Sequence, residues 1–164
     1  MRTAHLATGL ALALTCGVPT SSNAQLAAHK DLTLPIALTM AETAVQTCTA
    51  QGNKVSVHVL GRDGEVIVAM RGDGTGPHTV ENSFRKAYTS RFQRRPSGEF
   101  AKQAKDNPTV GALHLANMIP AQGALPIKVG DDVIGAIGVS GSPGGDKDEA
   151  CAKAGIDKVA DQLK

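Results

Sequence analysis

The sequence predicts a single α+β domain in which an antiparallel sheet is covered by helices from its N-terminal and C-terminal ends. Two hairpin patterns lie in the interior of the chain, and helical patterns precede, separate and follow them. Strands joined by tight turns indicate antiparallel pairing, and amphipathic helices bury one face against such a sheet. A length of 164 residues suits one domain and leaves little room for two.

The first helix is expected over residues 34–51. Small apolar residues recur there at three- and four-residue steps and therefore share one face. Pro35 suits the first helical turn, and Gly52 suits the stop.

Two hairpins account for the predicted sheet. Valines alternate with other residues over 55–60, and Arg62-Asp63-Gly64 forms a turn into the apolar run 66–70. A second pair of strands is expected over 125–129 and 133–139, around a Gly-Asp-Asp turn. In the strand over 55–60, the alternation of side chains predicts that His58 faces outward.

Helical spacing returns over residues 79–93, where Phe84, Tyr88 and Phe92 follow one another at four-residue steps. Pro96 ends this segment. We expect this aromatic stripe to fix the helix to the sheet or to a neighbouring subunit, and a ligand-binding wall is the alternative.

The rest of the chain suggests short helices and a final amphipathic helix. Residues 97–117 indicate one or two short helices interrupted by Asn-Pro. The glycine-rich loop 140–145 is interpreted as a tight turn, because it lacks the lysine of a P-loop. Asp146 and Glu149 have the spacing of a capping box at the start of the last helix.

Composition restricts the possible functions. The formal net charge is only +2, which argues against a nucleic-acid-binding face, and composition excludes a polytopic membrane protein. Aromatic residues make up 2% of the chain, so the core must consist of small aliphatic side chains. A core built from such small side chains buries too little apolar surface for a highly stable monomer, so we expect a closed homo-oligomer.

The N-terminus has the pattern of a secretory signal over residues 1–24, followed by one domain over 25–164. Arg2 precedes an apolar stretch, and Ser22-Asn23-Ala24 provides a cleavage site. The stretch is shorter than the ~20 residues that span a bilayer, so no membrane anchor is expected after cleavage. Cys16 follows a Thr, which disfavours lipidation. We therefore expect a periplasmic or extracellular protein.

Cleavage would leave two cysteines, Cys48 and Cys151. In an oxidising compartment such a pair is a candidate disulfide. The alternative is two buried free thiols that behave as small hydrophobic side chains.

Among the histidines, none has the spacing of a multi-histidine metal site. His78 is the most suggestive, because it follows Gly-Pro at the mouth of a helix, where it can approach a flat cofactor and ligate its metal. A plain loop histidine is the alternative. Arg85 and Lys86 can pair with carboxylates such as propionates, or form a solvated helix face.

Several ordered motifs resemble the GlcG/HbpS-like haem-binding family, which also includes the C-terminal domain of some cobalamin adenosyltransferases. The resemblance covers nearly the whole chain after the signal. It rests on GAIGVSG (135–141), DEACA (148–152), AGI (154–156), VHVLGRDG (57–64), RKAYT (85–89) and GALPI (123–127).

This resemblance implies a profilin-like or PAS-like fold, a homo-oligomer, haem as the ligand and a role in haem or iron handling. His78 and Thr79 are the residues carried over as ligand candidates, with His78 as the metal ligand and His29 second. Arg85, Lys86 and Tyr88 complete the expected cofactor site. The alternatives are an enzyme acting on haem or a small organic acid, and a non-catalytic oligomeric accessory protein.

Overall fold

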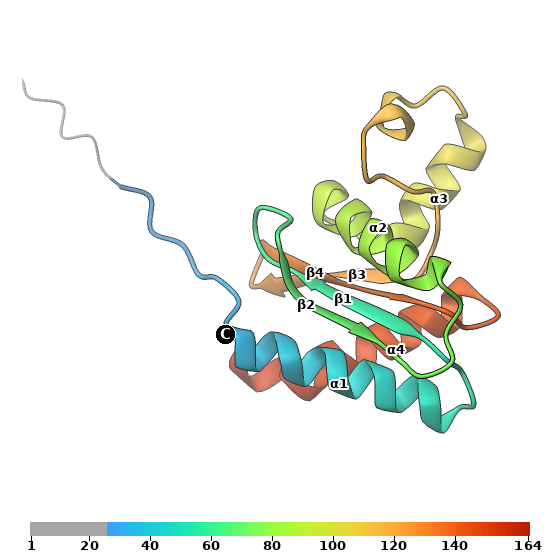
Figure 1. The fold of residues 1–164 in the computed structure, drawn as a ribbon. Helices are drawn as coiled ribbons and strands as arrows, with labels where there is room; N and C mark the ends of the chain where they lie inside the picture. The colour runs from blue at the N-terminus through green and yellow to red at the C-terminus, as the bar shows by residue number, and fades with distance from the viewer. Residues whose placement is uncertain (1–25) are drawn as a thin grey trace, which may run out of the picture.

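The computed structural model describes residues 26–164, which form three layers (Figure 1). The predicted secretion signal lies outside these residues. Two helices, α1 (Leu34–Ala50) and α4 (Gly145–Lys158), cover one face of a four-stranded sheet, and α2 (His78–Gln93) covers the other. The predicted α+β class, with one antiparallel sheet covered by terminal helices, is confirmed.

The sheet has the order β2-β1-β4-β3, with all neighbouring strands antiparallel. Its strands are β1 (Ser56–Leu60), β2 (Val66–Arg71), β3 (Ala124–Val129) and β4 (Asp132–Ser140). Both predicted hairpins are present, because each pair of sequence neighbours is joined by a short turn. The central strands β1 and β4 come from different hairpins, and their pairing brings residues of the middle and last thirds of the chain together.

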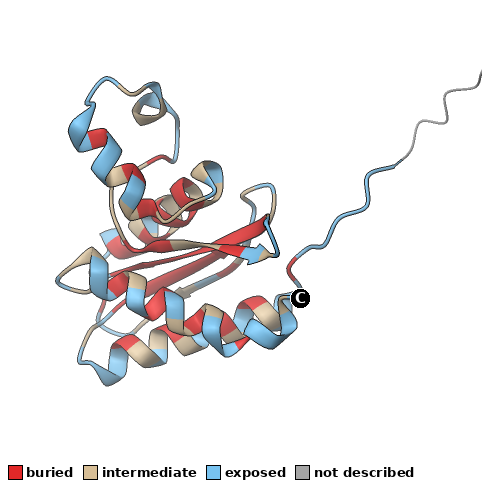
Figure 2. Cartoon of the chain, turned by 180° about the vertical axis from the view of Figure 1, so that it is seen from behind, coloured by how far each residue is buried: buried red, intermediate tan, exposed pale blue. Residues whose placement is uncertain are grey.

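The two faces of the sheet differ in chemistry. On the α1/α4 side, Val57, Val59, Ile137 and Val139 join an aliphatic core. On the α2 side, the intervening positions of β1 and β4 are polar or small except for Leu60, and Figure 2 shows that these central strands are buried between the covering layers. A Cβ atom at Gly138 would lie 2.3 Å from the Ser83 carbonyl oxygen, so glycine permits the close approach of α2.

The segment between α2 and β3 contains α3 (Ser97–Asp106) and the short 3₁₀ helix η1 (Gly111–His114), as expected from the Asn-Pro interruption. This segment projects from the α2 side of the molecule (Figure 1). A second 3₁₀ helix, η2 (Ala160–Gln162), ends the chain beside the start of α1. Within residues 26–164, no helix combines the length and apolarity needed to cross a membrane.

Two local expectations are wrong. His58 does not face outward to solvent; its residue is only 6% exposed, because α2 covers the second face of the sheet as well. The capping box at Asp146 and Glu149 does not form: α4 begins at Gly145, its N-cap is Gly144, and Glu149 instead accepts a hydrogen bond from Gln122.

Cys48 and Cys151 form a disulfide that joins α1 to α4, with their Cα atoms 5.7 Å apart. Both residues are fully buried on the aliphatic face of the sheet. Of the two alternatives for these cysteines, the structure therefore has the disulfide rather than two free thiols.

Candidate ligand-binding site

An open pocket of about 510 Å³ lies where the N-terminal ends of α2 and α4 meet the end of β4. His78, Thr79, Asn82 and Lys86 line it from α2. The loop that follows β4 and the first turns of α4 form the opposite wall, so the glycine-rich loop interpreted as a tight turn is also part of this pocket. Unpaired backbone N–H groups at helix N-termini favour anions, and two such ends border this pocket.

His78 is the first residue of α2, and its side chain is exposed at the pocket. The imidazole lies against Gly76: a Cβ atom at that position would be 2.8 Å from the His78 Cε1 atom. Glycine at position 76 therefore makes room for the ring. Among the described residues, no hydrogen bond or ion pair engages the two ring nitrogens, which leaves either one available to a metal.

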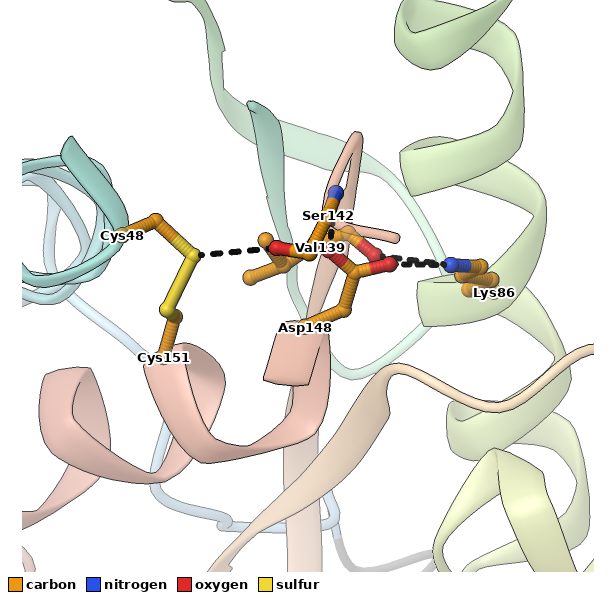
Figure 3. Close-up of a disulfide and its surroundings, with 6 residues drawn as sticks. All are labelled: Cys48, Lys86, Val139, Ser142, Asp148 and Cys151. Carbon is orange, nitrogen blue, oxygen red and sulfur yellow. Dashed lines mark hydrogen bonds and ion pairs between the residues drawn. A yellow bond between two sulfur atoms is a disulfide. The ribbon is translucent and has the colours of Figure 1, made fainter. Parts of the chain in front are cut away.

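Lys86 and Asp148 form a buried ion pair at the pocket, with 2.8 Å between Lys86 Nζ and Asp148 Oδ2 (Figure 3). Their side chains are 8% and 3% exposed. Lys86 Nζ also donates a hydrogen bond to the Val139 carbonyl oxygen at 3.1 Å. This pairing stabilises two charges that would each be costly to bury alone.

The ion pair is connected to the disulfide through the loop after β4. The backbone N–H of Ser142 donates to Asp148 Oδ1 at 3.0 Å, and Ser142 Oγ lies 3.5 Å from Cys48 Sγ (Figure 3). Asp148 and Cys151 are three residues apart on α4 and therefore lie on neighbouring turns. The disulfide thus holds the helix that carries the acidic partner of Lys86.

The pocket is otherwise polar. Thr79 is buried, and its hydroxyl lies 2.8 Å from both Ser56 Oγ and the Gly76 carbonyl oxygen, so it fixes the start of α2 on β1. Lys54 lies beside Gly74, and neither a hydrogen bond nor an ion pair holds its ammonium within residues 26–164. Within residues 26–164, Lys54 is therefore a cation of the pocket without a charged partner, whereas the charge of Lys86 is compensated by Asp148.

Three of the residues predicted for the site lie together, and three do not. His78, Thr79 and Lys86 line the pocket. Arg85 instead donates to the Met118 carbonyl oxygen at 2.7 Å and braces α2 against the segment before β3.

Tyr88 and His29 lie at other places. Tyr88 packs with Phe84 against a small cluster of Leu60, Ala87 and Ala136, as expected for a helix fixed to the sheet, whereas Phe92 is 52% exposed. His29 precedes α1 and lies 3.4 Å from Asp31, to which it can pair when protonated.

His58 has a structural environment under α2. Its Nδ1 atom lies 2.8 Å from Ser83 Oγ, and its ring packs edge-on against Phe84. Burial lowers the pKa of the imidazole, which favours the neutral form. His58 is therefore not part of the pocket lining.

Sequence reasoning missed Lys54, Asn82 and Asp148. Asn82 is one helical turn after His78, so helical periodicity was a usable signal. Lys54 and Asp148 reach the pocket from distant segments. Lys54 belongs to none of the motifs above, and Asp148 belongs to DEACA (148–152), a motif that marks the family without assigning the carboxylate to a site. No group of three or more His, Cys, Asp or Glu side chains suited to a metal ion occurs in the part of the chain that the structure describes.

Comparison with known proteins decides the family. The family model for HbpS-like haem-degrading proteins matches residues 32–157. The chain belongs to the HbpS-like family. This family membership confirms the resemblance seen in the sequence motifs.

Solved structures of the family have the same fold. The crystal structure of HbpS has a TM-score of 0.78 and 34% sequence identity to this chain, and the match covers 84% of this chain and 96% of HbpS. A double mutant of Streptomyces reticuli HbpS is 33% identical, with a TM-score of 0.78 and coverage of 87% and 97%. No curated protein has significant sequence similarity to the chain.

A less similar protein with the same fold has been solved in complex with haem. PduOC, solved in complex with haem, has a TM-score of 0.71 over 77% of this chain and 94% of PduOC, at 19% identity. At that identity the match shows a shared fold only.

Proposed function

We propose that this HbpS-like protein is an exported haem-binding protein of the periplasm or the extracellular space, that it assembles as a homo-oligomer and that it handles haem or iron. Membership of a family described as haem-degrading supports haem as the ligand, and the haem complex of a protein with the same fold adds to it. The secretion pattern of residues 1–24 supports export.

The observation that carries this proposal is the exposed imidazole of His78 at the pocket. Haem requires an axial donor, partners for its propionates and an apolar surface for its ring. His78 fits the first requirement, and Lys54 together with the N-terminal end of α2 fits the second. The polar lining fits the propionate edge of haem rather than its ring, so a second subunit would have to cover the ring.

In this proposal each residue has a defined task. His78 would hold the iron of haem through a ring nitrogen, and Lys54 would pair with a propionate. The Lys86–Asp148 ion pair does not contact the iron; it holds α2 and α4 at the spacing that forms the pocket. Bound haem would supply the redox-active iron.

Titration with hemin tests the proposal. We expect a Soret band that saturates at a fixed ratio of hemin to protein, and His78→Ala should weaken binding or shift the Soret maximum. His114→Ala is the matched control, because His114 is also an exposed histidine but lies outside the pocket. Unchanged affinity and spectrum in His78→Ala would contradict the assignment, and His29→Ala would be the next variant.

The same experiment separates binding from turnover. A Soret band that persists in the presence of a reductant agrees with a binding protein, whereas a band that decays with time indicates an enzyme acting on haem. Absence of any saturable Soret band would contradict haem binding and favour the alternative function, a non-catalytic oligomeric accessory protein.

A further inference from the structure

A second pocket, of about 190 Å³, lies at the other end of α2 from His78. The turn between β1 and β2 forms one wall, and the C-terminal part of α2 forms the other. The two pockets share no lining residue. The second pocket is lined by Arg62, Asp63, Gly64, Tyr88, Arg91 and Phe92.

Arg91 has no protein partner in this pocket. Its Nε atom is buried and makes no hydrogen bond, and among residues 26–164 no carboxylate lies within ion-pair distance of its guanidinium. An unsatisfied buried donor of this kind costs about 1–3 kcal/mol. Arg62 differs, because it pairs with both Asp31 and Asp132.

The surroundings of Arg91 disfavour its positive charge. Burial lowers the pKa of the Arg91 guanidinium, and the neighbouring cations Arg94 and Arg62 lower it further. Asp63 and Asp132 oppose this effect but are the weaker influences. A bound anion would supply a compensating negative charge and accept hydrogen bonds from the two Nη atoms of Arg91, which have no hydrogen-bond partner within residues 26–164 and, unlike Nε, are not among the fully buried atoms.

We propose that this pocket binds a small organic carboxylate, with the guanidinium of Arg91 on the carboxylate and the rings of Tyr88 and Phe92 against its apolar part. A planar guanidinium matches a carboxylate with two parallel hydrogen bonds. Phe92 is 52% exposed, so its ring is available to such a ligand. The volume corresponds to roughly six water molecules, which admits a small acid and excludes a tetrapyrrole.

Calorimetric titration with benzoate tests this site, because benzoate combines a carboxylate with a small apolar ring. Arg91→Gln should weaken benzoate binding by about tenfold or more, since it removes charge-assisted hydrogen bonds. Arg95→Gln is the matched control: Arg95 also has a buried, unpaired Nε, but it donates to Gln93 and Gln103 and does not line the pocket. The affinity of Arg95→Gln for benzoate should equal that of the wild type.

Asp63→Asn provides a test in the opposite direction, because it removes a negative charge in the pocket wall that would repel a carboxylate ligand. We expect this variant to bind benzoate several-fold more tightly. Absence of benzoate binding by the wild type, equal affinity of Arg91→Gln, or weaker binding by Asp63→Asn would overturn the proposal.

Two further readouts separate this site from other roles. Arg91→Gln should bind hemin as the wild type does, so failure of the carboxylate site is independent of the haem proposal. Light scattering compares the mass of the assembled protein in wild type and Arg91→Gln. If the variant has the lower mass and the wild type does not bind benzoate, Arg91 forms an ion pair between subunits and the proposal is overturned.

Discussion

Replacing Asp148 with Asn removes one charge of the buried ion pair while keeping the size of the side chain. The amide oxygen can still accept the hydrogen bond from the Ser142 N–H, so the variant isolates the effect of charge. Lys86 would keep only the Val139 carbonyl oxygen as a partner, in a position where its side chain is 8% exposed. Loss of one partner from a buried pair costs about 3–5 kcal/mol, which we expect for the fall in the free energy of unfolding.

Urea denaturation of a double-mutant cycle measures this coupling. Lys86→Met should also destabilise the protein, and the double variant should lose less than the sum of the two single variants, by about 1–3 kcal/mol. The exposed pair of Lys153 and Asp157 on α4 is the control, because its side chains are 66% and 59% exposed. Its variants should change stability by under about 1 kcal/mol. Additive losses at Lys86 and Asp148 would refute the role of the ion pair.

Three other properties follow from the structure. Replacing Cys48 and Cys151 with Ser should lower the free energy of unfolding by about 2–4 kcal/mol, because the disulfide closes a loop with a sequence separation of 103; mass spectrometry showing free thiols in exported protein would contradict it. Acidification below about pH 6.5 should destabilise the wild type more than the variant His58→Gln. The pKa of the buried His58 imidazole is lower in the folded than in the unfolded state, so the free energy of unfolding falls as the pH drops from the unfolded pKa toward the folded one. Equal pH profiles of the two proteins in urea titrations would contradict this prediction. Light scattering at micromolar concentration should give a mass above that of a monomer, and a monomer mass would rule out the expected oligomer.

The elements of the fold could be predicted because their signals are local. The small residues of α1 recur with helical spacing, and each hairpin contains a turn sequence between two apolar runs. His58 was placed wrongly because alternation along a strand distinguishes two faces without showing whether the second one is covered. All five residues of β1 are buried, and only the position of α2 explains this.

The candidate site was predictable only where it depends on one segment. His78, Thr79 and Lys86 belong to one helix, and residues eight apart lie about two turns from each other, so a sequence pattern could associate them. Asp148 is 62 residues from Lys86 in the sequence, and its contact depends on the pairing of β1 with β4 and on the packing of α4. Lys54 reaches the pocket in the same way, by tertiary structure alone.

The difference between the two sides of the sheet bears on the two pockets described above, which both border α2. The α1/α4 side is aliphatic and carries the disulfide, so it supplies stability without polar groups that need partners. The α2 side contains the His58–Ser83 contact, and Lys86 reaches from α2 to Asp148 on α4. These polar contacts fix geometry at a cost in desolvation. A helix held by specific polar contacts presents His78 at one end and Arg91 at the other in defined positions. The aliphatic layer therefore supplies stability that offsets the desolvation cost of the polar contacts, and these contacts fix the backbone of the helix that carries His78 and Arg91.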